Sequence, residues 1–404
     1  MTGPPIQGGW VEVAGGHVVA VGAGPAPGAA LDLGDVALLP GLVNAHTHLE
    51  LSWMAGRVPP AASFVAWIRT LMLDRRAHAS HDEEAHSEAI RRAAFALRDS
   101  GTVLVGDVSN TMTTAQVLRE AEIAGVIFHE MVGFNPVDPG AIVRDAWERI
   151  DRVIDPGPTL RAGDAWPGDA AGPGDVTACV VAHAPYSVLP TLFPEIVRRH
   201  RGGPLSVHVG ESAEEVEFLR TGEGPFRALL EELGVSTERW TPPACDPVTY
   251  LSRVGYLQPG MLAVHAVQLS DDQLQQLRRA QAVIVTCPRS NSWVGVGAPR
   301  LSHFYASGVP VAIGTDSLAS TPTLSLFDEL AELRRIAPDV AAASLLESAT
   351  RIGAEALGFG RTFGTIAPGR RAAFARVQVP PGTTDVEEYL VSGVPPSAVQ
   401  PLWL

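Results

Sequence analysis

Eight short apolar runs recur along the chain, separated by stretches rich in Ala, Leu, Arg and Glu with helical periodicity. Strands that alternate with helices predict an α/β protein with parallel sheets. The runs are nearly continuous in apolar residues, as expected when helices cover a sheet outside and side chains fill its inside. Eight is the number of strands that a closed (β/α)8 barrel, the TIM barrel, requires. The expected strands are Gly41 to Ala45, Thr102 to Asp107, Gly125 to Met131, Thr177 to His183, Leu205 to His208, Met261 to His265, Ala282 to Thr286 and Val309 to Thr315.

The two ends of the chain differ from this pattern. Residues 1–37 and 364–404 are rich in Gly, Val and Pro and lack helical periodicity. Short strands from both ends are therefore expected to meet in a small composite domain that resembles a β-sandwich. The predicted barrel then comprises residues 38–363.

The composition excludes several classes of partner. With 44 acidic and 30 basic residues the net charge is −14, which argues against binding nucleic acid or an anionic membrane. No stretch reaches the length of a membrane-spanning helix, and the first residues lack a signal-peptide pattern. The three cysteines are far apart, which suggests neither a thiolate metal site nor a disulfide framework. We expect a cytoplasmic protein with a small-molecule substrate, and a homodimer is left open as its assembly.

Histidines and one aspartate stand at the ends of four expected strands. His46 and His48 are two apart on the first strand, so both imidazoles project from one face and can share an ion. His208, His265 and Asp316 end the fifth, sixth and eighth strands, and the ends of barrel strands converge at one face. Together, His46, His48, His208 and Asp316 form a ligand set that suits Zn²⁺ or Fe²⁺ and leaves a position open for water. The alternative is that His208 and His265 are core histidines and Asp316 a helix cap.

Longer motifs surround these residues, and in combination they resemble the amidohydrolase superfamily. The nearest branch looks like the one that holds nucleobase and nucleoside deaminases and triazine hydrolases. This resemblance implies a metal site formed by His46, His48, His208 and Asp316. The motifs are Leu39-Pro-Gly-Leu-Val-Asn-Ala-His-Thr-His48, the HxxE of His208 to Glu211, Cys287-Pro-Arg-Ser-Asn291, Gly314-Thr-Asp316, Ala349-Thr-Arg-Ile-Gly-Ala354 and Gly364-Thr-Ile-Ala-Pro-Gly369.

The chain contains no lysine, so all 30 of its basic residues are arginine. Binuclear members of the superfamily commonly bridge two metals with a carboxylated lysine, which this chain cannot supply. We therefore expect one divalent ion, with Zn²⁺ preferred over Fe²⁺.

The resemblance and the residues together imply a hydrolytic mechanism. Water on such an ion becomes hydroxide near neutral pH and can attack an sp² carbon. Asp316 is expected to take a proton from the water, while His265 steadies the hydroxide. Glu211 is expected to protonate a ring nitrogen and the leaving amine, which requires a raised pKa. The alternative for Glu211 is a surface residue in the acidic run that follows, whose Glu214, Glu215 and Glu217 are expected on a solvated helix face.

Three further residues are candidates for substrate binding. His183, in His-Ala-Pro-Tyr186, resembles the substrate-contacting histidine of the superfamily, although it could instead cap a turn. Trp67, in Phe64-Val-Ala-Trp67, resembles a tryptophan that packs on a flat substrate, but it is as readily a core residue. Arg289 could bind a substrate carboxylate or phosphate, and a structural salt bridge is its alternative.

We predict a hydrolase of carbon–nitrogen bonds other than peptide bonds, namely a deaminase of an amino-substituted purine or pyrimidine. An aminofutalosine-like compound, whose carboxylate could meet Arg289, is one candidate substrate. Nucleoside-using relatives often place an acidic residue where this chain has Val65 and Ala66, which weakens the case for an ordinary nucleoside. One alternative is an amidohydrolase with another leaving group, such as a triazine chloride or a cyclic amide. Another is a catalytically silent barrel that serves as a binding or scaffold protein.

Overall fold

The computed structural model describes residues 3–78, 83–134, 138–154, 168, 171–235, 237 and 240–404. The strands are β1 (Gly9–Ala14), β2 (His17–Ala23), β3 (Val36–Pro40), β4 (Leu42–Thr47), β5 (Thr102–Val108), β6 (Ala124–Met131), β7 (Val176–Ala182), β8 (Ser206–Val209), β9 (Leu262–His265), β10 (Val283–Thr286), β11 (Val311–Ile313), β12 (Ala373–Gln378) and β13 (Val399–Trp403). The longer helices are α1 (Phe64–His78), α2 (Glu83–Asp99), α4 (Pro139–Val153) and α12 (Leu326–Ile336). Shorter helices are η1 (Leu49–Met54), α3 (Thr114–Glu120), α5 (Leu192–Arg198), α6 (Ala213–Thr221), α7 (Pro225–Glu232), α8 (Pro247–Arg253), α9 (Asp271–Arg279), α10 (Pro288–Trp293), α11 (Leu301–Ser307), α13 (Ala342–Ser348), α14 (Arg351–Ala356), α15 (Val386–Val391) and η3 (Pro396–Ala398).

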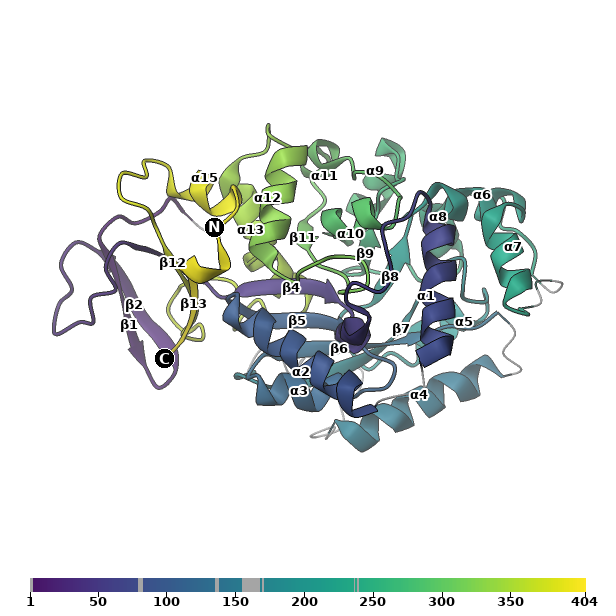
Figure 1. Cartoon of the computed structure of the whole chain (residues 1–404), viewed down its shortest axis with the longest axis horizontal. Coiled ribbons are helices and arrows are strands. Elements are labelled where there is room, and N and C mark those ends of the chain that lie inside the picture. Colours follow the sequence, from purple (N-terminus) through teal and green to yellow (C-terminus); the bar gives the residue numbers. More distant parts are fainter. Residues whose placement is uncertain are drawn as a thin grey trace.

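All eight predicted strands form, each within two residues of its expected ends. They make two parallel four-stranded sheets, with the orders β4-β5-β6-β7 and β11-β10-β9-β8. Helices follow the strands along the chain, as Figure 1 shows. The predicted α/β architecture with parallel strands is therefore confirmed.

Backbone hydrogen bonds connect the two sheets at both of their edges. At the junction of β7 with β8, the His208 N–H donates to the His183 carbonyl over 2.9 Å. Where β4 meets β11, the N–H groups of Thr315 and Asp316 donate to the His46 carbonyl over 3.0 and 3.1 Å. These bonds bring four predicted site residues, His46, His183, His208 and Asp316, to the meeting edges of the sheets.

The strands bury side chains on both of their faces. In β6, Ile127 belongs to a large apolar cluster together with Leu118 of α3, whereas Phe128 belongs to a second cluster with Phe359 and Phe363. Successive strand residues point to opposite faces, so both faces of β6 are covered. This burial explains why the strands read as continuous apolar runs in the sequence.

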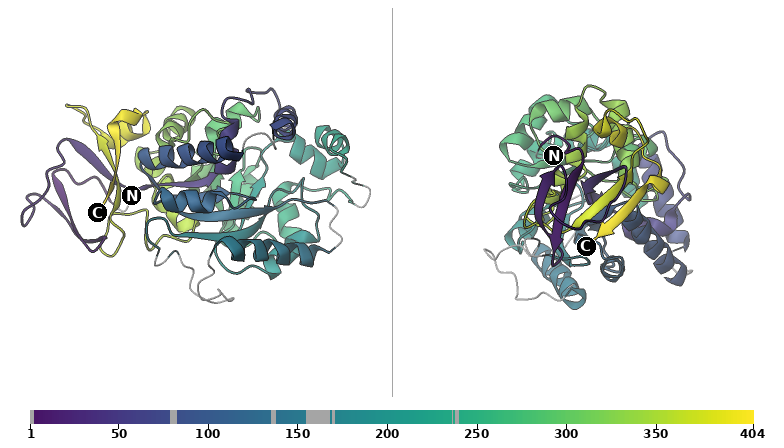
Figure 2. Two further views of the ribbon diagram at one scale, coloured as in Figure 1. Left: turned by 60° about the horizontal axis from the view of Figure 1, so that its bottom comes forward. Right: turned by 90° about the vertical axis from the view of Figure 1, so that its left-hand side faces the viewer.

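The ends of the chain meet in small antiparallel sheets. Strand β12 pairs with β3 on one side and with β13 on the other, and β1 pairs with β2. A bridge between His17 and Arg371 joins β2 to the segment that leads into β12. These strands and both termini lie at one end of the molecule (Figures 1 and 2), while β4 points toward the other end, where α6 and α7 lie. Across the described part of the chain, no helix has the length and apolar character needed to span a bilayer.

Candidate active site

Three imidazoles converge where β4 and β8 end. The Nε2 atom of His46 lies 3.1 Å from Nε2 of His48 and 3.3 Å from Nε2 of His208. The Oδ1 atom of Asp316 is 3.5 Å from Nε2 of His48 and 4.0 Å from Nε2 of His46. The structure thus brings all four predicted metal ligands together.

The chemistry of this donor set fits a divalent cation. Burial lowers the pKa of His46, His48 and His208, so the imidazoles are neutral and their lone pairs are available. The ligand atoms of these histidines all lie within 4.8 Å of one another. Three neutral imidazoles and one carboxylate are a ligand set typical of Zn²⁺.

Asp316 is held by two hydroxyl groups. Its Oδ2 atom accepts hydrogen bonds from the hydroxyls of Ser290, over 2.5 Å, and Ser320, over 3.0 Å. Burial raises its pKa, but the neighbouring histidines and the Ser290 hydroxyl outweigh that effect and hold the pKa below its usual value. Since Oδ2 is engaged by the serines, Oδ1 faces the imidazoles.

The His265 ring is oriented by an amide on α10. Its Nδ1 atom lies 2.9 Å from Oδ1 of Asn291, which can only accept, so Nδ1 carries the proton. The other nitrogen, Nε2, is 3.6 Å from Oε1 of Glu211. Burial lowers the pKa of His265 and raises that of Glu211 well above its usual value. Burial thus favours the protonated form of Glu211, which lies opposite the nitrogen of His265 that carries no proton.

A tight turn after β8 places Glu211 in the site. Gly210 has φ +61°, and a Cβ there would lie 2.4 Å from the side chain of Leu269. Ser212 caps α6 by accepting from the Glu215 N–H over 3.2 Å. The Glu215 carboxylate accepts in turn from the N–H groups of Gly210, over 3.0 Å, and Glu211, over 2.9 Å. The expectation that Glu215 faces solvent was wrong, because these bonds hold it in a fully buried position.

His183 adjoins the histidine cluster. Its ring centroid is 4.9 Å from that of His208, and its Nδ1 atom is 2.6 Å from the hydroxyl of Ser187. Burial lowers its pKa to about 3. His183 is therefore an uncharged, partly exposed ring beside the histidine cluster.

The other two predicted substrate residues have protein partners. Trp67 is buried in the core and lies parallel to Phe64, with ring centroids 6.3 Å apart. The Arg289 guanidinium donates to the Thr323 hydroxyl over 2.9 Å and lies 3.4 Å from Asp328 and 3.7 Å from Glu329. These contacts favour the core and salt-bridge alternatives for the two residues.

Two polar features of the site were missed by sequence reasoning. Glu130, in β6, is buried with Oε1 3.3 Å from Nδ1 of His208, and burial raises its pKa well above the usual value. The sequence does carry a sign of Glu130, because this acidic residue lies within an apolar run, near its end, and not after the run. Ser290 and Ser320, which bind Asp316, carry no such signal.

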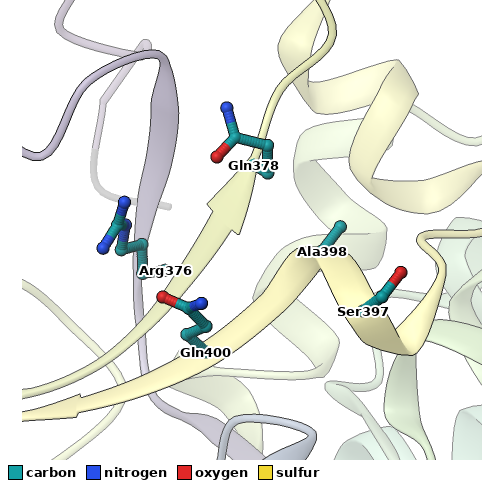
Figure 3. A pocket seen from close by; sticks show the side chains of 5 residues that line it. All are labelled: Arg376, Gln378, Ser397, Ala398 and Gln400. Atoms are coloured by element: carbon teal, nitrogen blue, oxygen red, sulfur yellow. The ribbon is translucent and has the colours of Figure 1, made fainter.

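A pocket elsewhere has different chemistry. It lies on the small sheet and is shown in Figure 3; its lining residues are Arg376, Gln378, Ser397, Ala398 and Gln400. The one charged group among them, Arg376, donates to the Leu33 carbonyl over 3.0 Å. This pocket offers no metal-ligating side chain, so the histidine cluster is the candidate active site.

The family assignment rests on most of the chain. Residues 37–396 match the model of the amidohydrolase family, and the chain belongs to that family. The predicted superfamily is therefore confirmed.

Two relatives that match in sequence are named as deaminases. The chain is 29% identical to the aminodeoxyfutalosine deaminase of Deinococcus radiodurans over 360 residues, which cover 83% of this chain and 77% of that protein. It is 28% identical to the 5-methylthioadenosine/S-adenosylhomocysteine deaminase of Nitratidesulfovibrio vulgaris over 384 residues, covering 90% and 78% of the two chains.

Solved structures share the fold at lower identity. An adenosine deaminase from Xanthomonas campestris with bound zinc superimposes with a TM-score of 0.77 at 24% identity, covering 98% of this chain and 86% of that one. The Helicobacter pylori aminofutalosine deaminase gives a TM-score of 0.76 at 22% identity, with 96% and 90% covered. The zinc-containing atrazine chlorohydrolase of Arthrobacter aurescens gives 0.74 at 19% identity, with 94% and 86% covered.

Proposed function

We propose that this member of the amidohydrolase family is a metal-dependent hydrolytic deaminase of an amino-substituted purine derivative. One observation carries the proposal: a buried carboxyl group, Glu211, lies beside His265 at the edge of a site built from three imidazoles and Asp316. Such a site combines a cation-binding centre with a proton donor, as hydrolysis of a carbon–nitrogen bond requires. The names of the similar proteins from Deinococcus radiodurans and Nitratidesulfovibrio vulgaris, both deaminases, support the same reaction.

The residues that would hold the ion are His46, His48, His208 and Asp316. Zn²⁺ is the proposed metal, because the nitrogen-rich ligand set suits it and two of the similar structures contain zinc. A single ion is proposed because the chain has no lysine to bridge two metals. When bound, the ion would supply Lewis acidity that activates water.

Three side chains are proposed to move or hold protons. Asp316 is ionised and accepts a proton from the attacking water. Glu211 donates its proton to a ring nitrogen of the substrate, which makes the adjacent carbon more electrophilic. It then takes the hydroxyl proton of the adduct and passes it to the departing amine, and the proton held by Asp316 afterwards restores Glu211. His265, whose Nδ1–H is fixed by Asn291, presents its free Nε2 atom as an acceptor for the water.

The proposed substrate class is an adenine-containing nucleoside, such as aminodeoxyfutalosine or 5-methylthioadenosine. The adenine ring carries an amino group on a carbon next to a ring nitrogen, which is the arrangement that Glu211 and Asp316 would serve. We propose that His183 contacts this substrate. Trp67 and Arg289 are proposed to shape the site through Phe64, Asp328 and Glu329 rather than to touch the substrate.

The finer architecture and the setting of the protein are also proposals. We infer that the two four-stranded sheets form one closed (β/α)8 barrel over residues 38–363, because hydrogen bonds join them at both edges. Residues 1–37 and 364–404 would form a sandwich-like β-domain, with β3 crossing the boundary between the two.

Three free cysteines support a cytoplasmic location. A homodimer is proposed as the assembly, and its mass in solution would test it.

The test is ammonia release by the purified, metal-analysed protein from a panel of substrates. The panel contains aminodeoxyfutalosine, 5-methylthioadenosine, S-adenosylhomocysteine, adenosine and free adenine, with atrazine as a probe of chloride release. We expect stoichiometric metal and ammonia from at least one nucleoside. Chloride release without ammonia would favour the alternative leaving group, and absence of metal together with absence of turnover would favour a silent barrel.

A further inference from the structure

The buried carboxyl group of Glu130 lies behind the third proposed metal ligand. Glu130 is 7% exposed, and its Oε1 atom is 3.3 Å from Nδ1 of His208. Its backbone N–H donates to Oδ1 of Asn110 over 2.8 Å, which fixes the end of β6. Glu130 takes part in none of the proposed proton transfers.

The two nitrogens of His208 face different surroundings. Nε2 lies 3.3 Å from Nε2 of His46, at the point where the imidazoles converge. Nδ1 faces the His183 carbonyl, over 2.9 Å, and Glu130. A neutral imidazole carries one proton, and acceptors on the Nδ1 side keep it there. The lone pair of Nε2 is thereby left for the ion.

Glu130 lies beside a nitrogen of His208 that already has a backbone carbonyl as its hydrogen-bond acceptor. The His183 carbonyl accepts not only from Nδ1 of His208 but also from the backbone N–H of the same residue, over 2.9 Å. Oε1 of Glu130 lies 3.3 Å from the same nitrogen, and an acidic oxygen beside the N–H of an imidazole increases the basicity of the ring. By contrast, Nδ1 of His46 is buried and has no hydrogen-bond partner within the described part of the chain. The acidic acceptor therefore distinguishes His208 from His46.

Glu130 faces His208 and no basic residue. Within the described residues, no arginine forms an ion pair with Glu130, and its ion-pair partner is His208. An ion held by Nε2 of His208 would lie on the far side of the ring from Glu130.

We propose that Glu130 is a positioning residue that holds His208 with Nε2 toward the metal and strengthens its bond to the ion. This inference rests on the proposed metal-dependent function. It concerns the affinity for the metal, so it can be tested without a substrate.

The test is zinc affinity, measured by competition with a chromogenic chelator, for the wild type and two variants. Glu130→Ala removes the acceptor and is expected to weaken zinc binding about 10- to 100-fold. Glu130→Gln keeps the shape but replaces the acidic group with a neutral amide, so a smaller weakening in the same direction is expected. The absorption spectrum of the cobalt(II)-substituted proteins should shift in the same order, because the ligand strength of His208 changes.

Glu50→Gln is the matched control. Glu50 is another carboxylate near the site, but it accepts from Ser109 and from Thr111. The zinc affinity of the Glu50→Gln protein should stay within about threefold of the wild type, as expected for a residue that does not bond to a proposed metal ligand. Thermal unfolding of the metal-free proteins checks that each variant is folded.

The outcomes distinguish failure of the proposed role of Glu130 from failure of the proposed metal-dependent function. Wild-type zinc affinity in both Glu130 variants would overturn the role of Glu130 and leave the metal site standing. If Glu130→Ala does not fold, Glu130→Gln alone decides, since it preserves volume. A wild-type protein that binds no metal would instead refute the proposed function itself.

Discussion

Ser290→Ala should impair the reaction through Asp316 without removing the metal. The Ser290 hydroxyl donates to Oδ2 of Asp316 over 2.5 Å, and both residues are buried. A hydrogen bond to a charged group contributes about 1.5–3 kcal/mol. Since about 1.4 kcal/mol corresponds to a tenfold change in rate, kcat/KM should fall by about 10- to 150-fold if the bond matters fully in the transition state.

The pH dependence gives a second measure of the same effect. The Ser290 hydroxyl lowers the pKa of Asp316, so its removal raises that pKa. Asp316 must be ionised to accept a proton, and the acidic limb of the kcat/KM profile should therefore move to higher pH. Removal of both hydroxyls in Ser290→Ala/Ser320→Ala should move it further, since Ser320 also donates to Oδ2.

The assay is ammonia release across pH on metal-analysed protein, with Ser317→Ala as control. Ser317 is buried in the same turn, but its hydroxyl contacts Ser320, over 3.2 Å, and no hydrogen bond joins it to the Asp316 carboxylate within the described residues. Its kcat/KM should stay within about threefold of the wild type, because the hydrogen bond that it loses joins two neutral groups. An unmoved acidic limb in Ser290→Ala, or equal losses in Ser290→Ala and Ser317→Ala, would refute the reasoning.

Three further variants test other parts of the structure. Glu211→Gln should retain metal yet lose about 10²- to 10⁴-fold in kcat, because the proton donor is gone; a near-wild-type rate would remove Glu211 from the mechanism. Burial raises the pKa of Glu329 to about 8, so the protonated form of this carboxyl group favours the folded state. Its contribution to stability is complete below the pKa that Glu329 has in the unfolded chain, and it is lost as the pH rises through 8. Relative to Glu329→Gln, the wild type should thus lose on the order of a few kcal/mol between pH 5 and pH 9; urea unfolding showing a pH-independent difference would contradict this. Tyr256→Phe should cost about 1–3 kcal/mol in urea unfolding, because the hydroxyl accepts from the Ala182 N–H and donates to the Ser206 carbonyl; a cost below about 0.5 kcal/mol would show that this bridge between β7 and β8 is unimportant.

The eight parallel strands could be predicted because their physical setting leaves a plain mark on the sequence. Strands covered on both faces must be apolar at successive positions, as in Val126, Ile127 and Phe128 of β6. The pairing of β3 with β12 leaves no such mark. Those strands lie at opposite ends of the chain, and only the folded structure shows that Val36 is the partner of Gln378.

The convergence of the proposed metal ligands could be expected because their strand-end positions and motifs agree, whereas the settings of several neighbours could not be predicted. Trp67 and Arg289 each had two interpretations that depend on a partner, and the partners Phe64 and Asp328 become evident only through packing. Glu215 looked like an ordinary acidic residue in the first turn of a helix. Its burial follows from the turn at Gly210, whose geometry the sequence does not display.

Glu130 was missed for a different reason. Strand-end reasoning points to polar residues that follow a strand, but Glu130 lies within β6, one residue before its end. An acidic residue in a buried run is costly unless a partner compensates for it. That cost is a signal in its own right, and it points to a functional neighbour such as His208.

The junction of β4 with β11 also determines when the site can form during synthesis. His46 and His48 leave the ribosome long before Thr315 and Asp316, whose N–H groups pair with the carbonyl of His46, and β3 must wait for β12. Contacts this distant in sequence form late and slow the folding of a chain. His46 and His48 therefore lack Asp316 as a neighbour until these later segments have been made. Assembly of the complete histidine and aspartate cluster is for this reason expected to be a late event, coupled to the joining of the sheets.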